Sequence, residues 1–401
     1  MKINILIFFI VLFTLSNCSS TWSDYIDKGT VSKTDFEETT DIELINNLVI
    51  TEVKIKGKTY KFLFDSGAPL SISETIQNDL DFKILSSDYI VDSDNNRKKV
   101  DWVQLDEIQI GKLSFNNQTA FVGNFSSNPV LKCLGIDGII GSNLIRQMNT
   151  TINQQEKSII FSDKNKPVID YDFSIPFKSD VQHNIFIDLK IGDIRLNNVL
   201  IDYGSNAGFS IDADIWSKLK ANGIIEKTIT EEGIQQAGII GEPILFLREY
   251  AIIDDLSIGN HELNVIVLRT GKTTSIGNRI LSKYLITIDW KTKTLYFTQD
   301  EFTHFNEEYY GFKLGYSKSK NVYIQSVIEN SQAQKLGVLP NYKVTKFDEI
   351  NFNGNEDFCD YVFLKKKERV YIEVEDSNGR SIAFTIKKEP LSNLLKNIDN
   401  D

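Results

Sequence analysis

The stretch FLFDSGAPLSIS, residues 62–73, places a carboxylate at the end of an apolar run and follows it with a glycine. A carboxylate is costly to build into a protein core, and a glycine lets the backbone turn sharply. A second stretch, VLIDYGSNAGFSI at residues 199–211, repeats this arrangement. One copy would be an ordinary turn, but two matched copies predict a function for Asp65 and Asp202.

The features around the two stretches also recur in the same order. IQIGKLSF is echoed by LSIGNHEL, and GIIGSNL is echoed by SIGNRIL. Short β-branched and aromatic runs, separated by Gly, Asn and Asp turns, are typical of an all-β protein with brief helices. A repeat of this length predicts two β lobes of nearly equal size, residues 43–168 and 169–300.

Two carboxylates that meet across a lobe interface cannot both ionise readily, because like charges repel in a partly desolvated site. They would share a proton, so that one carboxylate takes a proton from water while the other protonates a carbonyl oxygen. The plain alternative is a pair of solvated Asp turns in an ordinary β duplication.

These residues resemble the two-lobed, pepsin-like aspartic proteases of the compact bacterial kind related to retropepsins. The resemblance rests on DSGA with GIIGSNL and on DYGS with SIGNRIL. It implies a catalytic pair, Asp65 and Asp202, that activates a water to hydrolyse peptide bonds in a peptide or protein substrate. No cofactor and no metal are implied. The supporting residues would be Ser66, Gly67, Ala68, Tyr203, Gly204, Ser205, Gly141 and Gly277.

Tyr203 departs from the family pattern, which has Ser or Thr at this position to brace the two turns. The hydroxyl of a tyrosine lies too far from the backbone to make that hydrogen bond in the same geometry. A second hypothesis is therefore a surface lipoprotein that binds peptides but has lost turnover, and a third is a purely structural envelope protein. A Tyr203 ring between the two carboxylates would favour the second hypothesis.

Proteases of this type cover the cleft with a hairpin flap. The run YIVDSDNNRKKVDWV predicts such a hairpin in the first lobe, with Asp94, Asn95 and Asn96 at its turn. Trp102 either lines the substrate groove or is a core aromatic residue. In the second lobe, GIQQAGIIGEPILF contains three glycines and suggests a mobile loop over the other side of the cleft.

Residues 308–390 resemble a PDZ domain, which binds peptide carboxylates through loop amides and a strand edge. The loop residues implied are Gly311, Phe312, Leu314 and Gly315, and the implied ligand is the C-terminus of a peptide. Asn341 and Tyr342 stand where Gly-Asp is usual in that family. A small β extension of the protease is the alternative interpretation.

The N-terminal run, MKINILIFFIVLFTLSNC, has the length of an export signal and is short for a membrane span. LSNC resembles a loose lipobox, which implies lipidation of Cys18 and a place in the bacterial cell envelope after removal of residues 1–18. A plain secretory signal is the alternative. The polar residues 19–42 are typical of a tether.

The remaining composition argues against other classes of function. The net charge of −11 comes with no basic stripe, so nucleic acid is an unsuitable partner. Cys133 and Cys359 are far apart in different expected domains, which predicts no disulfide framework. The three histidines have no ligand-like spacing, and we expect no metal site.

Overall fold

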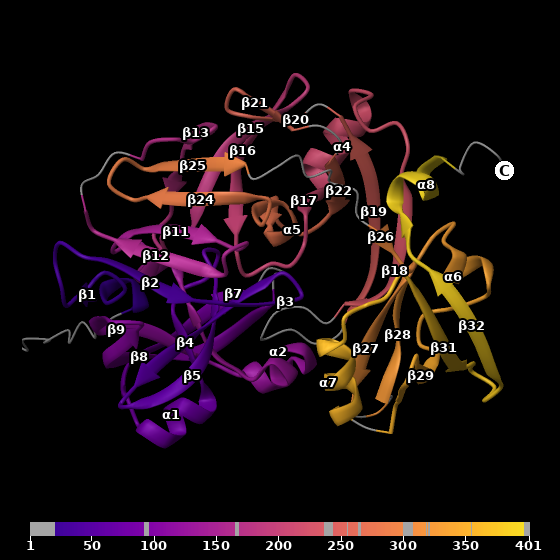
Figure 1. Cartoon of the computed structure of the whole chain (residues 1–401), viewed down its shortest axis with the longest axis horizontal. Helices are drawn as coiled ribbons and strands as arrows, with labels where there is room; N and C mark the ends of the chain where they lie inside the picture. The colour runs from indigo at the N-terminus through magenta and orange to yellow at the C-terminus, as the bar shows by residue number, and fades with distance from the viewer. Residues whose placement is uncertain are drawn as a thin grey trace, which may run out of the picture.

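The computed structural model describes residues 21–91, 96–164, 168–235, 244–254, 256–263, 266–299, 308–317, 319, 321–353 and 355–396. Strands make up 53% of the protein and helices 15%, which confirms the prediction of an all-β fold. Figure 1 shows three units, with the first at the lower left, the second above it and the third on the right.

The first unit begins with a short 3-10 helix and ends with a hairpin. Ser73 caps the helix that follows the first Asp turn, because its hydroxyl accepts a hydrogen bond from the Ile76 amide at 3.1 Å. Its elements are η1 Trp22–Asp24, β1 Thr30–Val31, β2 Glu37–Asp41, β3 Glu43–Ile45, β4 Leu48–Ile55, β5 Lys58–Phe64, β6 Ser71–Ser73, α1 Glu74–Leu80, β7 Lys83–Val91, β8 Arg97–Ile110, β9 Leu113–Gly123, η2 Phe125–Ser127, α2 Pro129–Leu134, β10 Ile136–Ile140, α3 Ser142–Ile145, β11 Asn149–Asn153 and β12 Ser158–Ser162.

The second unit contains the other Asp turn. Asp212 caps the helix after that turn by accepting hydrogen bonds from the amides of Asp214 and Ile215. Its elements are β13 Phe173–Pro176, β14 Lys178–Ser179, β15 Ile185–Ile191, β16 Ile194–Asp202, β17 Phe209–Ile211, α4 Ala213–Ala221, β18 Ile229–Gln235, β19 Ile244–Ile253, β20 Leu256–Ile258, β21 His261–Leu263, β22 Ile266–Thr270, β23 Ser275–Gly277, α5 Asn278–Leu281, β24 Tyr284–Asp289 and β25 Thr294–Gln299.

The third unit is a smaller sheet with short helices. Its elements are β26 Glu308–Tyr309, β27 Phe312–Ser317, β28 Asn321–Ile328, α6 Gln332–Lys335, β29 Lys343–Phe347, β30 Ile350–Asn351, α7 Asn355–Phe363, β31 Arg369–Glu375, β32 Ser381–Lys387, β33 Glu389–Pro390 and α8 Leu391–Lys396. Among the described residues of the chain, no helix is both long enough and apolar enough to cross a bilayer.

One six-stranded sheet joins the first two units, in the order β13-β25-β24-β11-β12-β2. Strand β11 pairs with β24 across the boundary, and the hydroxyls of Thr151 and Thr287 meet there at 2.8 Å. A single core of aliphatic and aromatic side chains continues from one unit into the other. The two Asp turns are therefore carried by one continuous framework.

The expectation of a tether over residues 19–42 is wrong for its described part. Strand β2 pairs antiparallel with β12 along its whole length, and Ile26, Phe36 and Ile42 are buried. These apolar residues are widely spaced among polar ones, so the segment resembles a solvated linker in composition although its backbone completes the shared sheet.

The expectation of no disulfide is also wrong. Cys133 in α2 and Cys359 in α7 form a disulfide, although 226 positions separate them in the sequence. The reason is that α2 of the first unit packs directly against α7 of the third, and residues of both helices belong to one apolar cluster. Sequence distance gave no sign of this contact.

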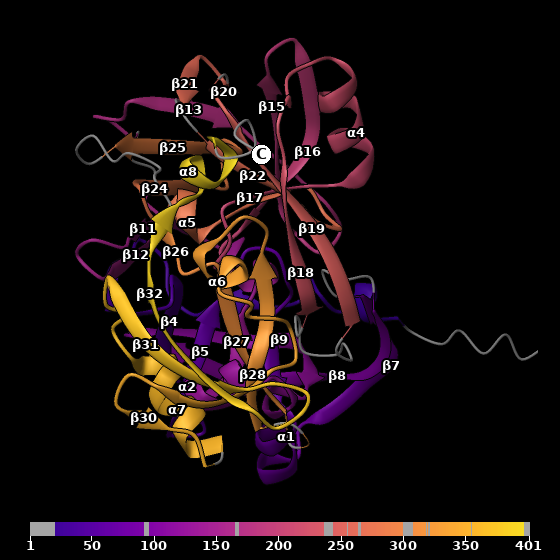
Figure 2. The same cartoon turned by 90° about the vertical axis from the view of Figure 1, so that its right-hand side faces the viewer.

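The third unit also contacts the second unit, through strand pairing. Strand β18 pairs antiparallel with β28, from Glu231 opposite Ile328 to Gly233 opposite Ser326. A Cβ on Gly233 would lie 2.2 Å from the carbonyl oxygen of Gln325, so only glycine fits this approach. Figure 2 shows β18 and β19 running down beside the third unit. The third unit is thus attached to both of the others.

Candidate active site

Each Asp turn follows a central strand that is supported by a parallel neighbour. Strand β5 leads into Asp65 and pairs with β10, whose Ile140 carbonyl accepts the Asp65 amide at 3.0 Å. Strand β16 ends at Asp202, which lies opposite Gly277 of β23. The same local arrangement therefore positions both carboxylates.

The structure brings the two carboxylates together across the boundary between the units. A Cβ placed on Gly204 would lie 2.2 Å from Oδ2 of Asp65, and one placed on Gly67 would lie 3.2 Å from Oδ1 of Asp202. Each carboxylate thus faces the glycine of the opposite turn. At Gly204 any side chain would displace the carboxylate of Asp65.

The surroundings of the pair favour the protonated forms. Burial raises the pKa of Asp65 to about 6, although the amides of Gly67 and Gly204 hydrogen-bond to it and oppose this shift. Burial and the adjacent carboxylate raise the pKa of Asp202 to about 8, against hydrogen bonds from the Gly204 and Ser205 amides. The pair therefore holds one proton over the interval between these values.

Ser66 braces the two turns from beneath. Its hydroxyl donates a hydrogen bond to the carbonyl oxygen of Ile201 at 2.5 Å and accepts one from the amide of Tyr203 at 3.2 Å. Ser66 is fully buried, so these bonds are shielded from water. One residue of the first turn thus holds the backbone of the second.

Among the described residues, the side chain of Tyr203 makes no equivalent hydrogen bond to the first Asp turn. Its ring is fully buried in the shared core, edge-on to Phe64 with ring centroids 5.5 Å apart. The hydroxyl has no hydrogen-bond partner among the described residues, and burial raises the pKa of Tyr203 far above its ordinary value. The ring packs beneath the turns with the core residues and does not fill the space between the carboxylates.

The two Ile-Gly elements support the turns through close backbone contacts. A Cβ on Gly141 would lie 2.1 Å from the amide nitrogen of Leu70, and one on Gly277 would lie 2.6 Å from the carbonyl oxygen of Ala207. The next amide in each element donates to the end of its own turn, Ser142 to Ala68 and Asn278 to Ser205, both at 2.8 Å. Only glycine allows these approaches.

The hairpins predicted beside the cleft are present as strand pairs, β7 with β8 and β18 with β19. Asp94 and Asn95 lie outside the described residues, as do Gly238 and Gly241 of the second hairpin, and Asn96 directly precedes β8. Of the two roles left open for Trp102, the structure shows the core one. Its ring is fully buried, because Trp22 stacks on it at 5.3 Å and Phe121 packs edge-on at 5.7 Å.

The expected peptide-binding loop of the third unit is folded into its apolar cluster. Phe312 and Leu314 are each only 7% exposed, and Gly311 has a φ of +82° that favours glycine. The Gly311 carbonyl accepts a hydrogen bond from the Ile328 amide at 2.8 Å, and Gly315 contacts the ring of Tyr323. The disulfide fixes α7 of this unit against the first unit.

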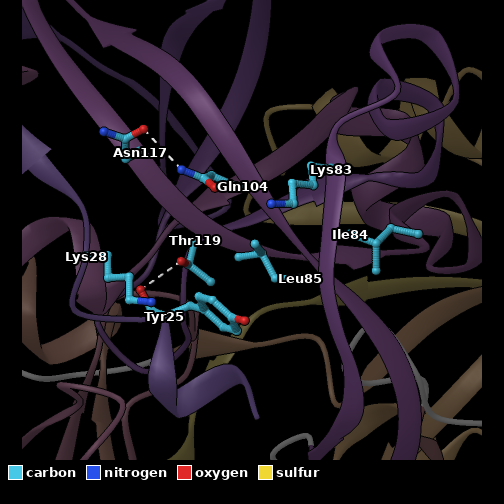
Figure 3. A pocket seen from close by; sticks show the side chains of 8 residues that line it. All are labelled: Tyr25, Lys28, Lys83, Ile84, Leu85, Gln104, Asn117 and Thr119. Atoms are coloured by element: carbon cyan, nitrogen blue, oxygen red, sulfur yellow. Dashed lines mark hydrogen bonds between the residues drawn. The ribbon is translucent and has the colours of Figure 1, made fainter. Parts of the chain in front are cut away.

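A pocket of about 160 Å³ lies away from the two carboxylates, between η1 and strands β7 to β9. Figure 3 shows its lining, in which Gln104 donates to Asn117 at 3.1 Å and Thr119 donates to the Tyr25 carbonyl at 2.9 Å. None of the predicted site residues lines this pocket. Nor do the described residues of the chain contain a cluster of three or more side chains of the metal-ligating types.

Sequence reasoning missed Arg269, whose charge lowers the pKa of Asp202. The signal was present in the internal repeat. Strand β22 pairs with β17 as β9 pairs with β6, so Arg269 occupies the position of Phe121 in the first unit. Matching AFVG with LRTG in the two halves of the sequence would have shown a cation in place of an aromatic residue.

Comparison with known proteins agrees with this geometry. No curated protein matches the chain. Residues 51–144, which include Asp65, Gly67 and Gly141, match the model of a family described as Aspartyl protease.

Proposed function

We propose that the protein is an exported aspartic endopeptidase in which Asp65 and Asp202 are the catalytic pair. The observation that carries this proposal is the meeting of the two carboxylates, each against the glycine of the other's turn. The match of residues 51–144 to the aspartyl protease family supports peptide hydrolysis as the chemistry. The two β units are then the two lobes of the enzyme.

In this proposal the pair holds one proton and binds a water between its carboxylates. The ionised carboxylate takes a proton from the water as its oxygen attacks the scissile carbonyl carbon, and the protonated one donates its proton to the carbonyl oxygen. Collapse of the tetrahedral intermediate returns a proton to the leaving amine, and no covalent bond to the enzyme forms. Backbone amides around the pair hold its geometry without side-chain rearrangement.

The rival proposal, a peptide-binding protein with a dead cleft, depends on Tyr203. The missing second brace supports it, because the Tyr203 hydroxyl bonds to no residue in the part of the chain that the structure describes. The burial of the ring beneath the turns argues against a plug between the carboxylates, and the Ser66 brace remains. We therefore favour turnover over binding alone.

Export, the lipid anchor and the peptide-binding role of the third unit belong to the same proposal. The Cys133–Cys359 disulfide supports an oxidising compartment, since such bonds are rare in the cytosol. Cys18 lies outside the described residues. Replacing Cys18 with Ser should release the protein from the membrane fraction, and retention of an unlipidated protein there would contradict the anchor.

The proposal is tested by incubating the purified mature protein with a mixed peptide library from acid to neutral pH and identifying products by mass spectrometry. Asp65→Asn and Asp202→Asn should each abolish cleavage. Asp188→Asn is the matched control, because Asp188 is paired with Lys178 and Arg195 away from the turns. Cleavage that survives both substitutions in the pair would overturn the proposal.

A further inference from the structure

Strand register defines a row of side chains that runs outward from Asp202 across the second unit. Leu200 of β16 lies opposite Ser275 of β23, and Ser275 lies opposite Ser210 of β17. Ser210 in turn lies opposite Arg269 of β22, and Arg269 opposite Tyr250 of β19. Side chains of directly paired residues share a face of the sheet, so these five form one line, the second-unit row.

The second-unit row lies on the face that meets the other Asp turn. The residues next to the row members in sequence, Ile201, Phe209 and Leu268 among them, point the opposite way into the shared core. The row begins at the catalytic pair, because a Cβ on Gly67 would lie 3.3 Å from Cδ2 of Leu200. Ser275, Ser210 and Tyr250 are buried, whereas Leu200 and Arg269 are partly exposed, so these two are the row members that a peptide beside Asp202 can reach.

The matching row of the first unit has a different chemistry. By the same register it consists of Leu63, Ile139, Ser71, Phe121 and Trp102. Four of these five side chains are apolar or aromatic, and none is charged. The second-unit row replaces the isoleucine by a serine and the phenylalanine by an arginine. The two rows thus differ in polarity although the strands are arranged alike.

Arg269 is held in place by a side-chain hydrogen bond. Its Nε donates a hydrogen bond to Oγ of Ser210 at 2.9 Å, which turns the side chain back along the row toward Asp202. Among the described residues it has no salt bridge. Burial is the main cause that lowers the pKa of Arg269, repulsion from Arg248 and Arg279 adds to it, and Tyr250 and Glu231 oppose it. A partly buried cation that makes no direct ion pair is unfavourable, and a carboxylate bound against it would offset this cost.

Glu231, a carboxylate whose charge acts on Arg269, is already engaged by other groups. Glu231 is fully buried, pairs with Lys313 at 2.8 Å and Arg248 at 3.3 Å, and accepts hydrogen bonds from the hydroxyls of Tyr250 and Ser326. The carboxylate oxygens of Glu231 on β18 therefore already bind groups of β19 and of the third unit. Arg269 remains available to an anion that enters from the cleft.

We propose that Arg269 is a specificity-determining residue that binds a carboxylate of the peptide substrate on the second-unit side of the cleft, an assignment that rests on the proposed peptidase function. The planar guanidinium presents paired donors that match a carboxylate in bidentate geometry. Ser210 fixes the orientation of the plane. The carboxylate comes either from an Asp or Glu side chain or from the C-terminus of the substrate.

Cleavage specificity tests this assignment. The best-cleaved sequences from the library are resynthesised in pairs, Glu against Gln at each position and free acid against amide at the C-terminus. The wild type should prefer one acidic position by about 10- to 100-fold in kcat/KM. Arg269→Ala should lose this preference, Arg269→Lys should keep part of it, and Arg269→Glu should favour a basic residue there. Arg195→Ala, an exposed arginine of the same unit, is the control that should change nothing.

The position of the preference distinguishes the two sources of the carboxylate. An internal Glu preference in amidated peptides identifies a side chain, and a loss of cleavage on amidation identifies the C-terminus. The assignment would be overturned if the wild type cleaves the peptides but its kcat/KM does not differ between the two members of any matched peptide pair. An Arg269→Glu variant that cleaves, folds as the wild type does by circular dichroism, and keeps the acidic preference would also overturn it.

Binding tests Arg269 without turnover. The Asp65→Asn variant, immobilised and mixed with a synthetic peptide library of fixed length, should enrich peptides with a carboxylate at one position. Adding Arg269→Ala should remove the enrichment. If the wild type cleaves nothing while this enrichment holds, the peptidase function fails and the carboxylate site stands. If no enrichment occurs, the carboxylate site fails whatever the outcome of the cleavage assay.

Discussion

The hydroxyl of Ser66 donates a hydrogen bond to the carbonyl oxygen of Ile201 and ties the first Asp turn to the strand that carries the second. The hydroxyl oxygen of Ser66 also accepts a hydrogen bond from the Tyr203 amide, so this one buried group bonds to both an acceptor and a donor of the opposite turn. Among the described residues the Tyr203 side chain makes no equivalent bond, so the side-chain brace from one turn to the other comes from Ser66.

Ser66→Ala should therefore lower kcat/KM sharply while the protein still folds. The change leaves the Tyr203 amide and the Ile201 carbonyl unsatisfied in a buried place, at a loss of about 1–3 kcal/mol in the free energy of unfolding. Ser66→Thr keeps the hydroxyl and should keep most of the activity. Steady-state kinetics and urea unfolding measure the two effects, and an Ala variant with wild-type kinetics would show that the brace is dispensable.

Tyr203→Phe should stabilise the protein. The substitution removes a buried hydroxyl for which the described residues offer no hydrogen-bond partner, and it keeps the ring that packs against Phe64. We expect a gain on the order of 1 kcal/mol in the free energy of unfolding with little change in activity.

Tyr203→Thr is the contrasting variant, since it restores a short hydroxyl for a second brace but leaves a cavity. It should preserve or raise kcat and lower the melting temperature. A loss of stability in the Phe variant would mean that the hydroxyl has a partner.

The all-β fold and the two Asp turns were predictable because they depend on local patterns. An apolar run that ends in Asp-x-Gly specifies where a strand ends, and this local signal does not depend on contacts with the other unit. The brief helices that the pattern predicts include α1 and α4, which follow the two turns, each with its side-chain cap.

Contacts between distant segments were not predictable from such patterns. Nothing in the sequence near Cys133 indicates that α2 meets α7, and the role of Arg269 depends on strand register across four strands. Trp102 is covered by Trp22, which lies in a segment too polar to look folded. Burial by a remote segment has no local signature, so these features required the structure.

Breaking the disulfide should loosen the third unit from the first. Cys133→Ser with Cys359→Ser removes a cross-link between distant parts of the chain, which typically lowers the free energy of unfolding by about 2–4 kcal/mol. Reductant should lower the melting temperature of the wild type but not that of the double variant, which is the matched control. Limited proteolysis should then cut between the second and third units. Equal melting temperatures in both redox states would contradict a cross-link in the folded protein.

Activity should be highest between pH about 6 and about 8, the interval in which the pair holds one proton. Below it both carboxyls are protonated and no base is present, and above it both are ionised and no acid is present. The profile of kcat/KM against pH measures this. Arg269→Ala should move the upper limb to higher pH, because the guanidinium lowers the pKa of Asp202. Arg195→Ala should leave the profile unchanged, and a profile without an upper limb would contradict the shared proton.

Asp202→Asn should stabilise the protein at neutral pH although it abolishes cleavage. The pKa of Asp202 is raised in the folded state, so between the ordinary value of 3.8 and about 8 the folded state binds more protons than the unfolded state. Stability of the wild type therefore falls as pH rises through this interval. The Asn variant does not undergo this loss, so its free energy of unfolding should exceed that of the wild type by about 1 kcal/mol or more at pH 8, with no such difference near pH 4.

Asp188→Asn is the control with the opposite sign, because the hydrogen bond from Lys178 lowers the pKa of Asp188 to about 2 and its ionised form is the favoured one. That variant should be less stable than the wild type at neutral pH and approach it in acid. Urea unfolding across the pH range measures how the free energy of unfolding of each variant changes with pH. If the difference between Asp202→Asn and the wild type does not grow with pH, the two carboxylates do not share a buried site.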